Sequence, residues 1–151
     1  MKFHLDGNEI IKAPLERTYA SLTDPNFMAS AIPDLQSYHV TDGEHFDAKI
    51  RVGISIVRGN VDMKFTLLDK VQNAHARLIG DGSGAGSKMR IDSSFDLSAM
   101  GEGTGMKWAS EAELSGLISG IGSQILRGQS EKQVTEIFKN IKNKLEESSP
   151  S

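Results

Sequence analysis

The run of residues that first invites a chemical interpretation is GDGSGAGSK, from Gly80 to Lys88. A phosphate-binding loop needs Gly-Lys-Ser/Thr opening a helix, and a dinucleotide fingerprint needs G-x-G-x-x-G. Here the glycines recur at every second position, and a strand is expected after Lys88. An extended chain places them all on one face, which leaves a strip without side chains. Two interpretations follow: a flexible hairpin or bulge, or a strip that makes room for a ligand or lets a loop move at a cavity mouth.

Residues suited to metal binding or acid–base catalysis do not form a recognisable group. The four histidines, His4, His39, His45 and His75, fall on separate expected strands or turns without H-x-H or HxxxH spacing, so no metal site is expected. The absence of cysteine excludes disulfides, thiolate ligands and a cysteine nucleophile. Glu9 is the carboxylate nearest to the expected inner face, at an edge or mouth, so a catalytic pair is missing.

A few polar groups interrupt apolar stripes. Ser93 and Ser110 are small polar positions, and Tyr38 and Trp108 each combine an apolar body with a polar tip. They could orient the head of a ligand, or they could be core residues whose polar atoms are satisfied.

Strands must position most of these residues. A first strand is expected over 3–11, and apolar residues then recur with a period of two near 35–42, 45–57, 60–71, 74–82, 88–99 and 104–115. Turn signals at Asp42-Gly43, Gly59-Asn60, Asn73 and Gly101 to Gly103 separate them. The pattern predicts an antiparallel meander.

One face of the expected sheet is apolar and the other is polar. The apolar face comprises Phe46, Ala48, Ile50, Val52, Val61, Met63, Phe65, Leu67, Met89, Ile91, Ser93, Phe95, Leu97, Met106, Trp108, Ser110, Ala112 and Leu114. A segment from about Leu117 to Leu145, with apolar residues at spacings of three and four, is expected to cover it as a long amphipathic helix. Gly116, Gly120, Gly122 and Gly128 would bend or divide this helix. The first three would allow close approach to the sheet, leave a void, or make the helix start flexible.

The segment from Ile10 to Pro33 packs several signals into a short stretch. Ala13-Pro14 ends the first strand, and Leu15 to Leu22 has the spacing of a helix. Asp24-Pro25 then starts a second short helix, which Pro33 ends. The order of strand, two short helices, sheet and long helix predicts an α+β fold.

Length and charge limit the remaining possibilities. The chain has 151 residues, which fit one domain, expected over 1–147 with a disordered tail over 148–151. The net charge of −3 provides no general field for nucleic acid, so no nucleic-acid partner is expected. No apolar run has the length of a signal peptide or a membrane span, which predicts a cytoplasmic protein with at most transient membrane contact.

This order of elements resembles the START-like (SRPBCC, helix-grip) superfamily: a seven-stranded antiparallel sheet wrapped around a long C-terminal helix, with two short helices after the first strand. Within it the chain is similar to the carbon monoxide dehydrogenase G-subunit family. Four stretches carry the likeness: Ala13-Pro14 with Thr23-Asp24-Pro25 and Ile32-Pro33; the hairpin strands 46–53 and 61–67; the alternating glycines of 78–86; and 114–126 leading to Phe138. The resemblance implies a cytoplasmic accessory protein of a molybdenum-containing carbon monoxide dehydrogenase or related hydroxylase, either free or peripheral at the inner membrane face. It also implies that the groove holds an apolar ligand such as a quinone or a lipid-like molecule.

We therefore expect a noncatalytic carrier of an apolar small molecule. The expected cavity residues are Phe27 and Met28 at one lip, with Met63, Phe65, Ser93, Phe95, Trp108, Ser110, Leu117, Gly120, Ile121 and Ile125. Two alternatives remain: an enzyme similar to the cyclases and dehydratases of the same superfamily, or an assembly module without a ligand. The first requires an acidic residue or histidine inside the cavity, and the second requires an exposed docking surface rather than a void.

Overall fold

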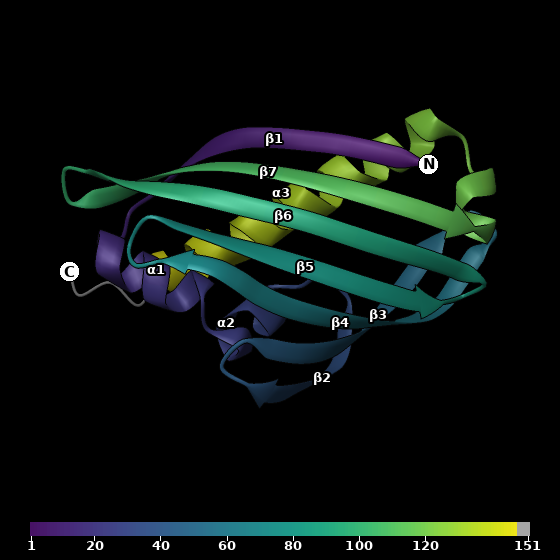
Figure 1. Ribbon diagram of the computed structural model, residues 1–151. Coiled ribbons are helices and arrows are strands. Elements are labelled where there is room, and N and C mark those ends of the chain that lie inside the picture. The colour runs from purple at the N-terminus through teal and green to yellow at the C-terminus, as the bar shows by residue number, and fades with distance from the viewer. Residues whose placement is uncertain (148–151) are drawn as a thin grey trace.

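Seven strands form one antiparallel sheet in the order β1-β7-β6-β5-β4-β3-β2 (Figure 1). The computed structural model describes residues 1–147, and the tail expected at 148–151 lies outside them. The strands are β1 (Lys2–Ile11), β2 (Leu35–Asp42), β3 (His45–Ile54), β4 (Val57–Val71), β5 (His75–Gly84), β6 (Ser87–Met100) and β7 (Gly103–Gly116). The helices are α1 (Leu15–Leu22), α2 (Pro25–Ser30), the short 3-10 helix η1 (Leu117–Gly120) and α3 (Ser123–Glu147). This arrangement confirms the expected α+β helix-grip fold.

The two short helices form as the proline signals predict. The Asp24 side chain accepts a hydrogen bond from the Asn26 backbone N–H at 3.0 Å, and Pro25 occupies the first position of α2. From α1, Tyr19 and Leu22 are buried in a core cluster shared with the sheet and the end of α3. The Tyr19 hydroxyl donates to the His75 carbonyl at 3.2 Å, and burial raises the pKa of this phenol. The pair of helices thereby closes one end of the sheet.

The strand register places the predicted apolar residues on the concave face. Phe46 lies opposite Phe65, and their rings stack with centroids 4.8 Å apart. Ser93 lies opposite Ser110, and Phe95 lies opposite Trp108. Because side chains of directly opposed residues share a face, one apolar surface runs across the sheet toward α3.

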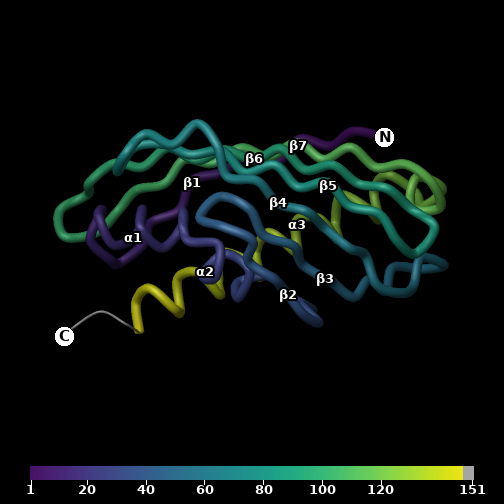
Figure 2. Tube along the Cα trace, turned by 60° about the horizontal axis from the view of Figure 1, so that its bottom comes forward, coloured from purple at the N-terminus to yellow at the C-terminus, as the bar shows by residue number. Residues whose placement is uncertain are grey.

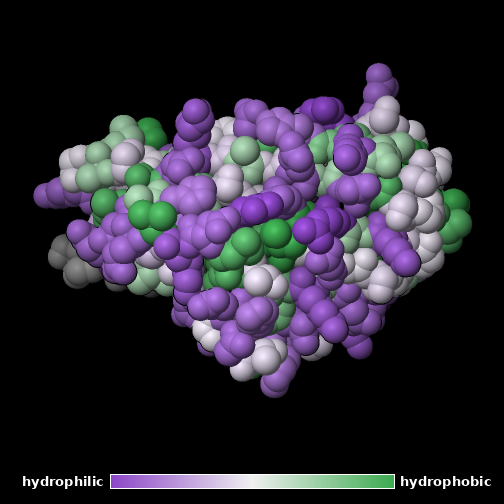
Figure 3. Space-filling view, in the orientation of Figure 1, coloured by the Kyte–Doolittle hydropathy of each residue, from purple (hydrophilic) through white to green (hydrophobic). Residues whose placement is uncertain are grey.

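The convex face carries charges that alternate from strand to strand. One row of directly opposed residues crosses all seven strands: Lys2, Glu113, Arg90, Asp81, Lys64, Asp47 and His39. Arg90 donates to Asp81 at 2.9 Å within this row. Opposite charges on adjacent strands favour this register, and in Figure 3 hydrophilic residues surround a central apolar area on this face. This side of the sheet therefore faces water.

The hairpin between β3 and β4 turns at Ser55-Ile56, so the turn predicted at Gly59-Asn60 is wrong. Gly59 and Asn60 lie within β4, where they pair with Val52 and Arg51. The two-residue turn keeps the apolar residues of both strands opposed, and Ser55 adopts a positive φ of 55° there. Cross-strand packing outweighs the local preference of glycine for a turn.

The C-terminal segment is divided near Gly116, Gly120 and Gly122, but the long helix begins later than expected, and Gly128 lies within it without interrupting it. The sequence pattern predicted helix from about Leu117, whereas 117–120 is η1 and α3 starts at Ser123. Gly116 adopts a φ of 84° next to the Gly86 carbonyl oxygen, a conformation and a clearance that a side chain would disturb. The chain therefore leaves β7 sharply before α3 crosses below the concave face (Figures 1 and 2).

Polar contacts hold the C-terminal half of α3 against the start of the chain. Lys142 Nζ lies 2.7 Å from a carboxylate oxygen of Glu9 on β1. Asn140 Nδ2 donates to the Ala31 carbonyl at 3.0 Å. Arg17 donates to the Leu145 carbonyl at 2.7 Å, near the end of the helix. These contacts fix the C-terminal half of α3.

Candidate functional site

A cavity of about 410 Å³ lies between the concave face of the sheet and α3. Its walls are mostly aliphatic and aromatic. From the sheet they include Leu5, Phe46, Ile50, Val52, Met63, Phe65, Leu67, Leu78, Met89, Ile91, Phe95, Met106, Trp108, Ala112 and Leu114, and from α3 they include Leu126, Val134, Ile137, Phe138 and Ile141. Ile91, Phe95 and Trp108 are only half-buried although α3 covers them, because the space between sheet and helix is not filled. The fold thus creates an apolar container.

The cavity opens between the end of β3 and the first half of α3. Strand β2 pairs with β3 only as far as Leu35 opposite Ile50, and beyond it the Arg51 N–H donates to the Asp34 carbonyl at 3.0 Å. The rim is polar, with Asp34 and Arg51 on one side and Gln129 and Gln133 of α3 on the other. A molecule entering here would pass between a sheet edge and a helix.

The polar groups inside the cavity are few. The Ser93 and Ser110 hydroxyl oxygens lie 2.7 Å apart, so one hydroxyl donates to the other. Among the lining residues only Asp34 and Arg51 carry charge, and both are exposed at the rim. Glu9, the carboxylate nearest to the inner face, does not line the cavity and instead contacts Lys142. The interior is suited to apolar molecules with one or two polar atoms near the serine pair.

Trp108 and Phe138 join the sheet and α3 through an aromatic contact. Their ring centroids lie 5.1 Å apart at an interplanar angle of 40°. Gly7 lies opposite Trp108 on β1, and a Cβ atom there would be 3.0 Å from the indole ring. The absence of a side chain at Gly7 therefore allows the Trp108 indole to pack directly against the backbone of β1.

The glycine strip of β5 accommodates side chains from the neighbouring strand. A Cβ atom at Gly80 would lie 2.6 Å from the Phe65 ring, and one at Gly82 would lie 2.0 Å from the Met63 sulfur. Both glycines sit directly opposite these residues in the β4–β5 register. The absence of side chains at these glycines lets Met63 and Phe65 lie across β5. These two side chains form the cavity wall there, and the glycines do not leave open space.

The structure brings together part of the predicted site. Seven of the predicted residues line the cavity: Met28, Met63, Phe65, Ser93, Phe95, Trp108 and Ser110. Five do not, because Phe27 packs against the α1 core cluster, Ile121 is buried in a cluster at the end of the sheet, and Leu117, Gly120 and Ile125 are exposed. A helix that starts at Ser123 rather than Leu117 presents different residues to the cavity. Nothing lies within 4 Å of a Cβ built at Gly120, so this glycine neither permits close packing nor borders the void.

Residues from the middle of α3 line the cavity in addition to those expected from the sequence. Val134, Ile137, Phe138 and Ile141 line the cavity, and Gln129 and Gln133 form its rim. The spacing of three and four between the apolar members was visible in the sequence. What the sequence did not indicate is which turns of the helix lie over the void.

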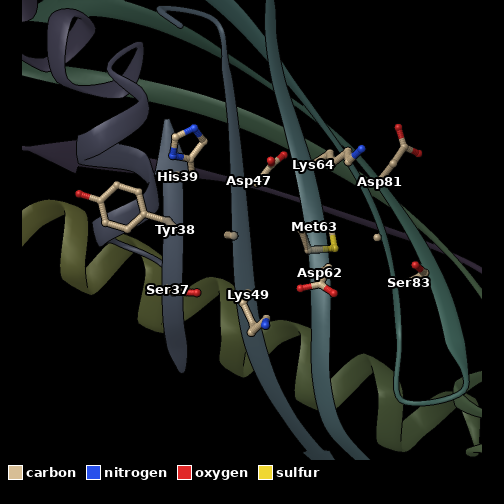
Figure 4. Close-up of a pocket in the computed structure, with 12 residues that line it drawn as sticks. Ser37, Tyr38, His39, Asp47, Lys49, Asp62, Met63, Lys64, Asp81 and Ser83 are labelled. Carbon is tan, nitrogen blue, oxygen red and sulfur yellow. The ribbon is translucent and has the colours of Figure 1, made fainter. Parts of the chain in front are cut away.

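A second hollow, of about 500 Å³, lies on the convex face across β2 to β5 (Figure 4). Charged and polar side chains line it, including Asp47, Lys64 and Asp81 in one cross-strand row and Lys49 and Asp62 in the next. Their alternating charges belong to the surface pattern of the sheet. We assign the candidate site to the apolar cavity because it is covered by α3 and lined from several elements.

The remaining titratable contacts lie outside the cavity. Arg77 donates to both carboxylate oxygens of Asp92 on the neighbouring strand, at 2.8 Å through Nε, and lies 3.5 Å from Asp69. This contact lowers the pKa of Asp92 and raises the pKa of Arg77. Within residues 1–147, no group of three or more histidine and acidic side chains is arranged to hold a metal ion. The contact between Arg77 and Asp92 joins β5 and β6 on the surface of the sheet.

Comparison of the fold with solved structures places the protein in a class. The chain is similar to a conserved protein from Geobacillus kaustophilus, with a TM-score of 0.88, 23% identity and 97% of each chain covered. It is also similar to a START superfamily protein from Mycobacterium smegmatis, with a TM-score of 0.75, 10% identity and coverage of 97% of this chain and 99% of that one. A protein from Thermus thermophilus matches with a TM-score of 0.72 and 17% identity, over 98% of this chain and 100% of that one. At these identities the likeness establishes the fold, which is START-like.

The sequence itself identifies the family. A sequence model of CoxG, the G subunit of carbon monoxide dehydrogenase, matches residues 7–146, and the chain belongs to this family. No curated protein matches it. Across the described part of the chain, no helix has the length and apolar character needed to cross a membrane.

Proposed function

We propose that this protein is a noncatalytic carrier of an apolar small molecule, a quinone or a lipid-like compound. In this proposal it serves as an accessory protein to a molybdenum-containing carbon monoxide dehydrogenase or a related oxidoreductase. The observation that carries the proposal is the apolar cavity between sheet and α3, which opens at a polar rim. Its volume of about 410 Å³ falls in the range of small-molecule sites.

The energetics of such a cavity suit reversible binding. Burial of about 300 Å² of apolar ligand surface at roughly 25 cal/mol/Å² would contribute about 7.5 kcal/mol before the costs of association. The walls supply this term without charged groups, and the Ser93–Ser110 pair adds one polar position for a ligand carbonyl or hydroxyl. A moderate apolar contribution with a single hydrogen-bonding position favours reversible binding of the ligand.

The family supports the proposed partner. The name of the CoxG family denotes an association with carbon monoxide dehydrogenase, an oxidoreductase, and such enzymes exchange electrons with acceptors. A carrier of an apolar acceptor would act in the cytoplasm and approach the inner membrane face transiently.

The direct test is native mass spectrometry of freshly purified protein, followed by solvent extraction of the bound molecule. We expect an adduct of a quinone or lipid that disappears on extraction. Ala112→Leu narrows the cavity and should weaken the adduct, whereas Gly120→Leu, outside the cavity, should retain it. A protein that is always empty and binds neither quinones nor lipids in titrations would disprove the proposal.

The cavity walls bear on the alternative of a cyclase or dehydratase. That chemistry needs an acid or a histidine in contact with the substrate, whereas the charged lining residues, Asp34 and Arg51, stand at the rim. The walls therefore favour the carrier. Turnover of a polyketide-like or hydroxylated substrate that is lost in Asp34→Asn would favour the enzyme instead.

A further inference from the structure

One end of the sheet exposes several large apolar side chains. The β3–β4 turn, the β5–β6 turn, η1 and the start of α3 meet there, because antiparallel strands bring these junctions to the same end. Ile56 is 70% exposed, Ile125 is 56% exposed and Leu117 is 51% exposed. We call this surface, formed by Ile56, Leu117 and Ile125, the apolar end. In Figure 3 hydrophobic residues reach the surface on the right, where Figure 1 draws η1 and the β3–β4 hairpin.

Contacts below the surface hold these junctions together. The Leu117 N–H donates to the Gly86 carbonyl at 3.0 Å, so η1 is tied to the β5–β6 turn. The buried residues Val57, Ile118, Ile121 and Leu126 form one cluster beneath the exposed ones. The apolar end is thus a supported surface rather than a set of isolated side chains.

Charge distinguishes this end from the opposite one. The segments 53–60, 82–89 and 114–130 contain Arg58, Lys88 and Arg127, all exposed, and no aspartate or glutamate. The turn segments at the opposite end, 41–45, 69–75 and 98–104, contain four acidic residues against one lysine: Asp42, Glu44, Asp69, Glu102 and Lys70. An acidic chain with a net charge of −3 therefore presents a locally cationic end that also exposes aliphatic side chains.

The apolar end adjoins the mouth of the cavity. Ile54 and Leu126 both line the cavity, and the exposed Ile56 and Ile125 stand close to them in the chain. A molecule leaving the gap between β3 and α3 would emerge beside this surface.

We propose that the apolar end docks on an anionic lipid bilayer, with Ile56, Leu117 and Ile125 inserted among the acyl chains and Arg58, Lys88 and Arg127 at the headgroups. Aliphatic side chains ringed by cations match the chemistry of an anionic bilayer interface. The acidic opposite end is repelled by the same surface, which fixes the orientation and points the cavity mouth toward the lipid. This inference rests on the proposed carrier function, because docking would let an apolar molecule pass between bilayer and cavity without crossing water.

Vesicle sedimentation of the full chain tests the proposal. We expect binding to vesicles of phosphatidylcholine and phosphatidylglycerol, little binding to phosphatidylcholine alone, and release at high salt. Ile125→Ser should weaken binding about tenfold through the lost apolar insertion. Arg127→Glu should weaken it by more than about fivefold, the effect of one cation near an anionic surface.

Matched controls lie at the opposite end. Val71 is 56% exposed, as Ile125 is, so Val71→Ser should leave vesicle binding unchanged. Lys70→Glu alters net charge as Arg127→Glu does and should have no comparable effect. Equal losses in the control variants, or no binding of the unmodified protein to anionic vesicles, would overturn the proposal.

The same variants separate docking from ligand carriage. Ile125→Ser should retain binding of a short-chain quinone in solution, while Ala112→Leu should weaken quinone binding and retain vesicle binding. Loss of vesicle binding by Ala112→Leu with normal folding would contradict an independent docking surface. Quinone binding without vesicle binding would leave the carrier function standing and overturn docking alone.

Discussion

Trp108 of β7 and Phe138 of α3 lie with their ring centroids 5.1 Å apart at the wall of the apolar cavity. Their contact links β7, the neighbour of the edge strand β1, to the helix that covers the sheet. Because the chain contains a single tryptophan, the fluorescence of the protein reports on this one place.

Binding of a quinone should therefore quench the tryptophan emission. Titration with a short-chain naphthoquinone is expected to give saturable quenching in the unmodified protein and in Gly120→Leu. Ala112→Leu should show weaker saturable quenching, because the larger side chain narrows the cavity. Saturable quenching of unchanged midpoint in Ala112→Leu would place the ligand elsewhere.

The serine pair should affect the choice of ligand more than the stability of the fold. Removing both hydroxyls in Ser93→Ala/Ser110→Ala avoids an unpaired buried group, so the change in unfolding free energy should stay below about 1 kcal/mol. Affinity for a ligand with a carbonyl head should fall about threefold to tenfold, as expected for one neutral hydrogen bond, while affinity for a pure hydrocarbon should not fall. Calorimetric titration with a matched quinone and hydrocarbon measures the difference, and equal losses for both ligands would argue against a polar contact.

Any side chain at position 82 should destabilise the fold. A Cβ atom there would lie 2.0 Å from the Met63 sulfur, so Gly82→Ala must displace Met63 along the cavity wall. We expect a loss of about 1 to 3 kcal/mol in unfolding free energy and a weaker ligand complex. Gly53→Ala, where nothing lies within 4 Å, is the matched control in denaturant unfolding. Similar unfolding free energies for the two variants would show that Met63 does not depend on the bare strip.

The contact between Glu9 and Lys142 should stabilise the C-terminal half of α3. Its side chains are 23% and 32% exposed, so Lys142→Gln should lower the unfolding free energy by about 1 kcal/mol or less and should speed amide exchange in α3 first. Lys139→Gln, an exposed position on the same helix, is the control. Identical exchange in the two variants would assign no anchoring role to this contact.

Low pH should remove the contribution of the Asp92 carboxylate to the stability of the fold. Arg77 lowers the pKa of this carboxyl below its ordinary value of 3.8, so its stabilising contribution is complete above that pH and is lost as the pH falls through the folded-state value. Asp92→Asn should therefore be less stable than the unmodified protein near neutral pH, with the difference shrinking below about pH 4. Thermal unfolding across this range checks the trend, with Asp47→Asn on the same face as control. A difference that grows in acid would contradict the assignment.

Much of the fold followed from the sequence because its signals are local and regular. A period of two predicted the strands and the inner face of β3, β4, β6 and β7, and Pro14, Pro25 and Pro33 marked the two short helices. The alternation also assigned Met63, Phe65, Ser93, Phe95, Trp108 and Ser110 to the surface that lines the cavity. Backbone geometry alone fixes which side chains of a strand share a face.

Tertiary structure decided where the chain turns and which part of the helix meets the sheet. Ser55-Ile56 rather than Gly59-Asn60 forms a turn because the register of β3 and β4 keeps their apolar faces opposed. The 3-10 turn at 117–120 moves the start of α3 to Ser123, so Phe138 rather than Ile125 reaches the cavity. The side chains of Met63 and Phe65 occupy the space above the glycines of β5, because they extend across from the neighbouring strand β4. Each outcome depends on contacts between residues distant in the chain, which the periodicity of one segment does not contain.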